Sequence, residues 1–154
     1  MSTPCKIILK LDKKDIGRSK KFNSEKLPLP YGDWVFKDAD GTIWRDESCE
    51  LKCKRVKLVG DYIGVYCHWD GHTDSTGRVL KRHFKTYDAV LNLLLGGFIS
   101  GMACGKVTNY ANRNVQKWDD IKPIQGSLED VKQSIYGQYE YIFEDGKWHC
   151  KKII

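Results

Sequence analysis

The stretch IGVYCHWDGHTDSTG, residues 63–77, decides how this chain folds. Apolar side chains at Ile63, Val65 and Cys67 alternate with the residues between them, which is typical of a β-strand. The strand pattern stops at Trp69, where a turn rich in Asp, Gly, Thr and Ser begins. We therefore expect a strand that delivers a dense group of polar and titratable side chains into one loop.

The length and composition are typical of one globular domain, residues 1–154. Hydrophobic residues make up 41% of the chain, which is enough for a packed core. No apolar run approaches the roughly 18 residues that a membrane span needs. The basic residues near the start follow the first apolar run instead of preceding it, so we expect no signal peptide and a cytoplasmic location.

Cysteine content and charge narrow the choice of partners. The six cysteines are expected to be reduced thiols in a cytosol, because no export signal accompanies them. Lys and Arg number 26 against 20 acidic residues, which gives a net charge of +6. This charge argues against a protein that imitates DNA, and it permits a nucleotide or another polyanion as ligand.

The pattern outward from the central stretch predicts an α+β fold, an antiparallel sheet with two or three helices packed on it. Apolar spacing indicates one helix after Ser75 or Thr76, another after Thr86 and a third after Ser127, all of which are good N-cap residues. Asp145 and Gly146 suit the turn of a hairpin. The expected strands span residues 5–11, 51–58 and 62–69, the hairpins residues 34–44 and 139–150, and the helices residues 77–84, 87–95 and 128–135.

Two segments fit no regular element. Residues 11–30 are rich in lysine and end near two prolines, so we interpret them as a solvated connection, with a phosphate-binding patch as the alternative. Residues 96–114 contain four glycines, and we interpret them as a ligand-facing loop. The spacing from Gly101 to Lys106 departs from the phosphate loop of nucleoside triphosphatases, which excludes that class.

Metal binding is the first chemical hypothesis. Cys49, Cys53, Cys67 and the nearby histidines are the ligand types that zinc prefers, but their spacing is looser than in structural zinc sites. Residues 38–40, DAD, would suit calcium, yet the rest of a calcium-binding loop is missing. We therefore predict no metal and no cofactor.

Acid–base catalysis is the second hypothesis. If residues 67–70 are extended, His68 and Asp70 share one face of the strand, and the carboxylate can orient the imidazole for proton transfer. A Cys67 nucleophile with His68 as its general base is less suited, since neighbours in a strand point to opposite faces. The alternative is that Asp70 only shapes the turn. Whether the chain is an enzyme stays open, and a binding protein is the preferred interpretation.

Ligand capture is the third hypothesis. Tyr66, Trp69 and Tyr110 offer ring faces for a base, while a basic helix face that includes Arg78 offers charge for phosphates. The helix start at Thr76 offers backbone N–H groups to an anion. The alternative is that the rings belong to the core and the basic residues only solvate the helix. The candidate ligand-binding residues are Tyr66, His68, Trp69, Asp70, Thr76, Arg78 and Arg113.

Five stretches resemble a family of small proteins that recur in phage and prophage genomes: DYIGVYCHWDG (61–71), RVLKRHFKTYDAVLNLLLGG (78–97), YANR (110–113), WDDIKP (118–123) and FEDGKW (143–148). The most specific part is YCHWDG, and the resemblance spans residues 7–148. It implies an accessory gene of a virus, and such genes often counter host defence.

Residues and resemblance together predict a phage protein that counters bacterial defence by sequestering a small nucleotide-type signal without cleaving it. A homo-oligomer is compatible with such a pocket. One alternative is a hydrolase of a phosphate or N-glycosidic bond that uses His68 and Asp70. Another is an inhibitor that binds a host defence protein directly, through a surface such as residues 13–21. A single-strand nucleic-acid binder is disfavoured, because the aromatic residues are not interleaved with the basic ones.

Overall fold

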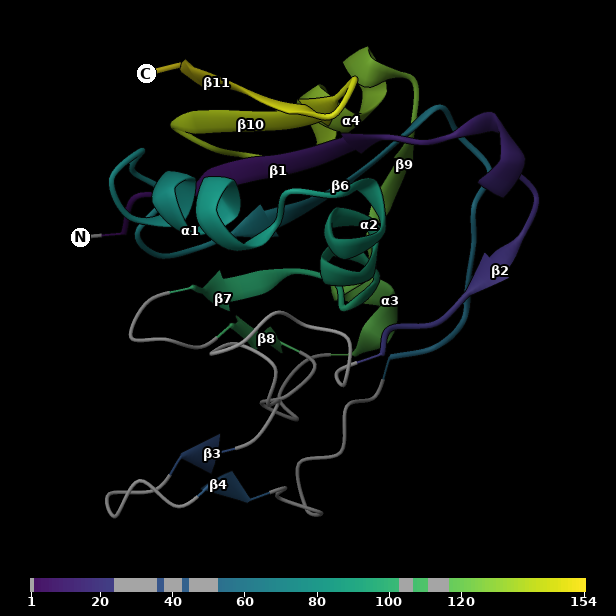
Figure 1. Ribbon diagram of the computed structural model, residues 1–154, viewed down its shortest axis with the longest axis horizontal. Coiled ribbons are helices and arrows are strands. Elements are labelled where there is room, and N and C mark those ends of the chain that lie inside the picture. The colour runs from purple at the N-terminus through teal and green to yellow at the C-terminus, as the bar shows by residue number, and fades with distance from the viewer. Residues whose placement is uncertain (1, 24–35, 38–42, 45–52, 103–106, 111–116) are drawn as a thin grey trace.

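The computed structural model describes residues 2–23, 36–37, 43–44, 53–102, 107–110 and 117–154. Figure 1 shows a central sheet with helices in front of it and behind it, which confirms the α+β prediction. Within these ranges no helix has both the length and the apolar character needed to cross a membrane.

The strands of the seven-stranded sheet lie in the order β11 (Lys147–Lys152), β10 (Tyr139–Glu144), β1 (Cys5–Lys10), β6 (Tyr62–Cys67), β7 (Ile99–Gly101) and β8 (Thr108–Asn109), and β9 (Ile124–Gly126) also pairs with β6. β6 is therefore an interior strand. The pairs β1–β10 and β6–β7 are parallel and the other pairs are antiparallel, so the sheet is mixed. This topology carries the end of β6 toward one rim of the sheet, beside β7.

Helices cover both faces of the sheet. Their bounds are α1 (Thr76–His83), α2 (Tyr87–Leu95), α3 (Trp118–Ile121) and α4 (Leu128–Ser134). Two predicted N-caps are confirmed: the Thr86 hydroxyl accepts a hydrogen bond from the Ala89 N–H, and the Ser127 hydroxyl accepts one from the Asp130 N–H. The short helix α3 was not predicted.

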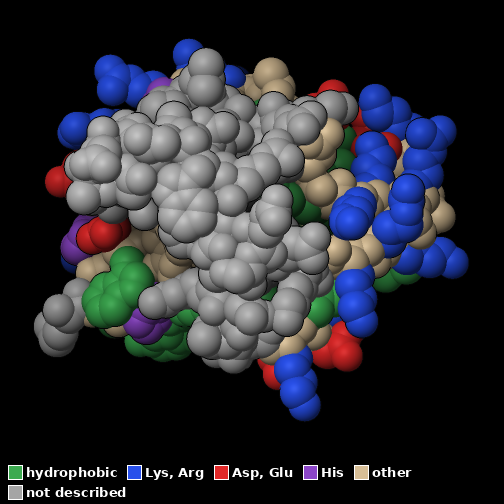
Figure 2. Space-filling view, turned by 90° about the horizontal axis from the view of Figure 1, so that it is seen from below, with side chains coloured by type: hydrophobic (Ala, Val, Ile, Leu, Met, Phe, Trp, Pro, Cys, Tyr) green, Lys and Arg blue, Asp and Glu red, His purple; other side chains and the backbone are tan. Residues whose placement is uncertain are grey.

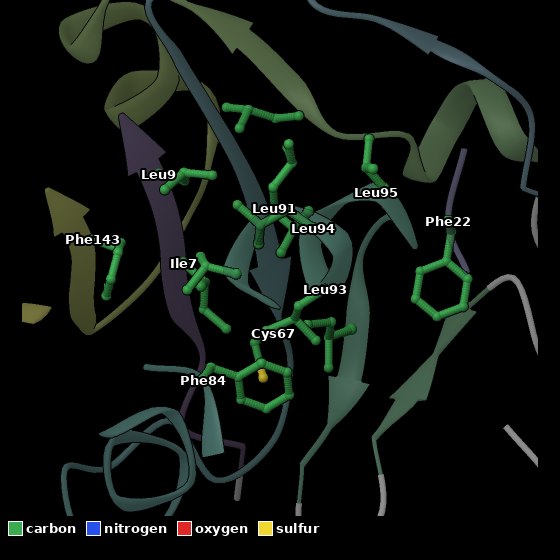
Figure 3. Packing of buried hydrophobic residues seen from close by; sticks show 14 of the residues in the cluster. Ile7, Leu9, Phe22, Cys67, Phe84, Leu91, Leu93, Leu94, Leu95 and Phe143 are labelled. Carbon is green, nitrogen blue, oxygen red and sulfur yellow. The ribbon is translucent and has the colours of Figure 1, made fainter. Parts of the chain in front are cut away.

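The core is divided by the sheet into two clusters. The larger one joins β1 and β6 to α1 and α2, and Figure 3 shows Ile7, Leu9 and Cys67 of the strands close to Phe84 and Leu91. The smaller cluster lies on the opposite face and joins Ile8 of β1 to α4. Because successive side chains of a strand alternate between faces, one apolar strand contributes to both clusters.

Two short ribbons lie outside the main sheet, β2 (Ser19–Lys20) with β5 (Val56–Lys57) and β3 (Phe36–Lys37) with β4 (Ile43–Trp44). The β3–β4 pair agrees with the predicted hairpin, whose turn lies outside the described residues, as does the proposed calcium segment. The 3-10 helix η1 (Lys13–Asp15) precedes β2. The basic connection is thus partly ordered, because its middle pairs with β5.

Candidate functional site

The site begins where β6 ends. The N–H groups of His68 and Trp69 donate to Ile99 and Ser100 at 3.0 and 2.9 Å, so the pairing with β7 continues for two residues. Asp70 then adopts a φ of +58°, a left-handed conformation that aspartate tolerates better than most residues. The chain therefore leaves the sheet at Asp70, and the extended geometry expected for residues 67–70 does not hold there.

The loop that follows is closed by Thr76. Its N–H and its hydroxyl both donate to the Asp70 carbonyl, at 3.0 and 2.7 Å, and the side chain is only 1% exposed. The Gly77 N–H donates to the carbonyl of His72 at 3.1 Å. Two N–H groups that we expected to be offered to an anion are therefore already bonded inside the loop.

The same loop is fixed to the N-terminal segment through Gly71. Its N–H donates to the Thr3 carbonyl at 2.7 Å, and its carbonyl accepts from the Tyr141 hydroxyl at 2.6 Å. A Cβ at Gly71 would overlap the Thr3 carbonyl oxygen, so the approach requires glycine. His72 is hydrogen-bonded to the Thr3 hydroxyl at 3.0 Å, which gives this imidazole a structural role.

Three ring side chains form a chain of contacts that ends at the surface. The Tyr66 hydroxyl and Nδ1 of His68 are 2.7 Å apart, and burial raises the pKa of Tyr66, so this hydroxyl stays protonated and able to donate at neutral pH. The edge of His68 meets Trp69 with ring centroids 4.5 Å apart and planes at 81°. Trp69 is 44% exposed while the other two are half-buried. Tyr66 and His68 therefore support an exposed indole.

The exposed side of α1 forms a groove of about 540 Å³, called here the α1 groove. Four cations line it, three from α1 and Lys85 from just beyond its end, and none forms an ion pair with an acid in the described part of the chain. Beside them, burial and then the charges of its basic neighbours lower the pKa of His83. The groove is lined by Thr73, Asp74, Arg78, Lys81, Arg82 and Lys85.

The predicted ligand residues fall into two groups. Tyr66 packs against the smaller core cluster, on the face of the sheet that α4 covers. Arg78 belongs to α1, which covers the opposite face. Trp69 and the loop after it connect the groups. Arg113 lies outside the described residues. Sequence reasoning missed Thr73 as a lining residue, because its role depends on how the loop folds over α1.

The geometry does not bring His68 and Asp70 together as a proton-transfer pair, since Tyr66 occupies Nδ1 and Asp70 leaves the strand. The described residues also contain no group of three or more His, Cys, Asp or Glu side chains able to hold a metal ion. Cys49, a candidate zinc ligand, lies outside them. Cys53 is buried, which raises its pKa to about 12 and keeps the thiol protonated.

Comparisons of this chain with protein-family models, with curated proteins and with solved structures find no significant match. The chemistry of the site is therefore the basis for its function. Cations, a hydroxyl and an exposed aromatic ring are groups that bind a phosphorylated aromatic molecule.

Proposed function

We propose that this protein binds a small nucleotide-type ligand without cleaving it, with the phosphates in the α1 groove and the base on Trp69. The observation that carries the proposal is the set of four exposed cations, without ion-pair partners among the described residues, around one groove. The groove is shallow and open to solvent, so it would contact the phosphates of a ligand while the rest of the ligand stays outside it.

The charge pattern of α1 supports an anionic ligand. Arg78 and Arg82 are four residues apart within α1, and like charges at this spacing destabilise a helix by a few tenths of a kcal/mol. The first turn of α1 contains no acidic residue, and Asp74, just before the helix, is the one carboxylate among the described residues that line the groove. Phosphate oxygens in the groove would relieve this repulsion, and the Thr73 hydroxyl can donate to the same oxygens.

The exposed indole supports an aromatic base as the other part of the ligand. Trp69 is not itself a lining residue of the α1 groove, but the bonds from Thr76 to Asp70 close the loop between them. The base then stacks on Trp69 while Tyr66 and His68 hold the indole in place. Stacking of this kind contributes about 1–3 kcal/mol per base.

Sequestration, in place of turnover, is supported by the geometry around His68, whose Nδ1 is bonded to Tyr66 while Asp70 turns away from the strand. With the resemblance to phage proteins, this supports a role in which the protein removes a nucleotide-type signal of a bacterial defence system. A ligand held by charge and stacking is released intact when the protein is denatured.

Calorimetric titration with ATP and with inorganic tripolyphosphate tests the proposal. The variant R78Q/K81Q/R82Q should bind both probes at least tenfold more weakly, because each charge-assisted contact contributes about 1.5–3 kcal/mol. Trp69→Ala should weaken ATP binding about tenfold and leave tripolyphosphate binding unchanged. The matched control K147Q/K151Q/K152Q removes three exposed charges from β11 and should bind both like the parent.

Equal ATP affinity in R78Q/K81Q/R82Q and in the control would contradict the proposal. So would chromatography that finds ATP converted to a product during the titration. A product that disappears in His68→Ala would establish the hydrolase alternative instead.

A further inference from the structure

We infer that a second surface, built on the β2–β5 ribbon, binds the phosphate backbone of double-stranded nucleic acid. The basic ribbon, as we call it, consists of Lys20, Lys21, Lys54, Arg55 and Lys57. It lies outside the main sheet and packs on the core through Val56, while Lys21, Lys54, Arg55 and Lys57 are exposed. Nothing in this inference depends on the nucleotide site.

Two grooves flank the basic ribbon, and Arg55 lines both. One, of about 430 Å³, contains Lys20 and Lys21, and the other, of about 280 Å³, contains Lys54 and Lys57. Arg55 is held between them by a hydrogen bond from its guanidinium to the Ser19 carbonyl at 3.1 Å. Cations are thus spaced along an extended path, as successive phosphates of a nucleic-acid strand are.

Most of these charges are not compensated within the described residues. Lys21, Lys54 and Lys57 form no ion pair with a described acid. Lys20 pairs with Asp15 at 3.3 Å, but that carboxylate is 2% exposed and does not face a ligand. Figure 2 shows Lys and Arg side chains gathered on its right-hand side, the side on which β2 lies in Figure 1.

Each groove also contains one exposed acid. These are Asp88 in the larger groove and Asp119 in the smaller one. Asp119 is 3.7 Å from Lys122, another lining residue, so the local balance in the smaller groove stays positive. The side-chain amides of Asn92 and Gln125 already donate to the carbonyls of Asn23 and Lys57, both at 2.8 Å, so the lysines and Arg55 are the groups that contact phosphate oxygens.

A nucleic-acid backbone fits this surface better than an acidic protein does. A protein interface needs an apolar core with large exposed side chains. Among the described lining residues, Val56, Leu91, Leu95 and Trp118 are all buried. The burial of Trp118 also favours a duplex over a single strand, because single-strand binders stack bases on exposed rings.

Fluorescence anisotropy with a labelled 20-base-pair DNA duplex of arbitrary sequence, measured from 50 to 200 mM salt, tests the inference. The full chain should bind with strong salt dependence. In K21Q/K54Q/K57Q the slope of log affinity against log salt should be shallower by about 2.7, since each phosphate contact contributes about −0.9. The control K147Q/K151Q/K152Q, which removes the same charge elsewhere, should keep the parent slope.

Absence of duplex binding at 50 mM salt would overturn the inference. An equal decrease of the salt slope in K147Q/K151Q/K152Q would also overturn it, because the effect would then come from the net charge of the protein. Displacement of the duplex by polyglutamate at equal charge concentration would overturn it in favour of an acidic protein partner. ATP titration of K21Q/K54Q/K57Q keeps the two proposals distinct, because ATP should bind this variant like the parent.

Discussion

The α1 groove and the basic ribbon are both rich in Lys and Arg, but the two surfaces arrange these side chains differently. In the α1 groove, three cations of one helix and Lys85 just after its end surround one groove, next to a closed loop and an exposed indole. In the basic ribbon, the cations are spread along two short strands with a groove on each side. The first arrangement surrounds a compact anion, and the second follows an extended one.

The difference between the two surfaces shows that net charge alone does not identify a ligand. The +6 charge of the chain permits any polyanion. What separates the two surfaces is the element that carries the cations, since helical spacing gathers them on one face and a ribbon spaces them along a line. A variant of one surface can therefore be compared with the other surface as an internal reference.

Asp15→Asn should have the largest effect, and it acts on the ribbon side. The buried carboxylate accepts a hydrogen bond from Tyr87 at 2.8 Å and pairs with Lys20, so its loss should lower the free energy of unfolding by about 2 kcal/mol. Duplex binding should weaken because Lys20 loses its anchor, while ATP binding stays unchanged. Urea denaturation measures the stability, with the exposed Asp61→Asn as control, expected within about 0.5 kcal/mol of the parent.

The same carboxylate predicts acid sensitivity. Burial acts to raise the pKa of Asp15, but the hydrogen bonds from Tyr87 and Lys20 outweigh it and hold the pKa below its ordinary value. The unfolded state therefore binds the proton more readily, so the stabilisation is present above about pH 4 and is lost as pH falls through the folded pKa. An acid limb that is equally steep in Asp15→Asn would contradict this assignment.

Thr76→Val should have the next largest effect, on the helix side. Valine keeps the shape but removes the hydroxyl that donates to Asp70, so unfolding free energy should fall by about 1–2 kcal/mol and ATP affinity roughly tenfold. Thr86→Val is the matched control, because it removes the α2 cap at a similar cost in stability. Similar ATP losses in both variants would mean that stability alone explains the result.

Tyr66→Phe should have a smaller effect. It removes the hydroxyl that holds His68, so the indole of Trp69 loses support and ATP affinity should fall about two- to threefold, near 0.5 kcal/mol. Tripolyphosphate binding should not change. Tyr62→Phe removes a comparable bond to Glu144 from the same strand and should leave both probes unaffected. Calorimetry with the two probes would refute the supporting role if Tyr66→Phe binds ATP like the parent.

His83→Gln should have the smallest effect. The lowered pKa of His83 means that the unfolded chain takes up its proton first, so stability is lost as pH falls below about 6.5 and through the folded pKa. Glutamine cannot titrate, and thermal unfolding between pH 7 and 5 should therefore show a flatter profile. An unchanged profile would assign the pH dependence to other groups.

The sequence predicted elements whose signals are local. Thr86 and Ser127 act as caps because a side-chain oxygen needs only the next turn of its own helix. Asp145 and Gly146 form the expected hairpin turn with positive φ at both positions. The parallel pairing of β1 with β10 was not predictable in this way, because it joins distant segments whose register depends on the assembled core.

For the candidate site too, the sequence predicted only the features whose signals are local. Residues 66 and 68 do share one face of the strand, as period-two spacing requires, and their side chains are bonded. The expected partnership of His68 with Asp70 failed because one positive φ ends the alternation. Residues 11–30, which contain β2, were interpreted as a solvated connection, since the order of β2 depends on pairing with β5, about 36 residues away.

The most direct test of two distinct surfaces is one reciprocal measurement, in which R78Q/K81Q/R82Q and K21Q/K54Q/K57Q are each titrated with ATP and with the duplex at one salt concentration. Both variants lose three charges, so electrostatic attraction in general affects them equally. The account predicts that the first loses ATP binding at least tenfold and keeps the duplex, and that the second loses the duplex and keeps ATP. Equal losses of both ligands in both variants would contradict it.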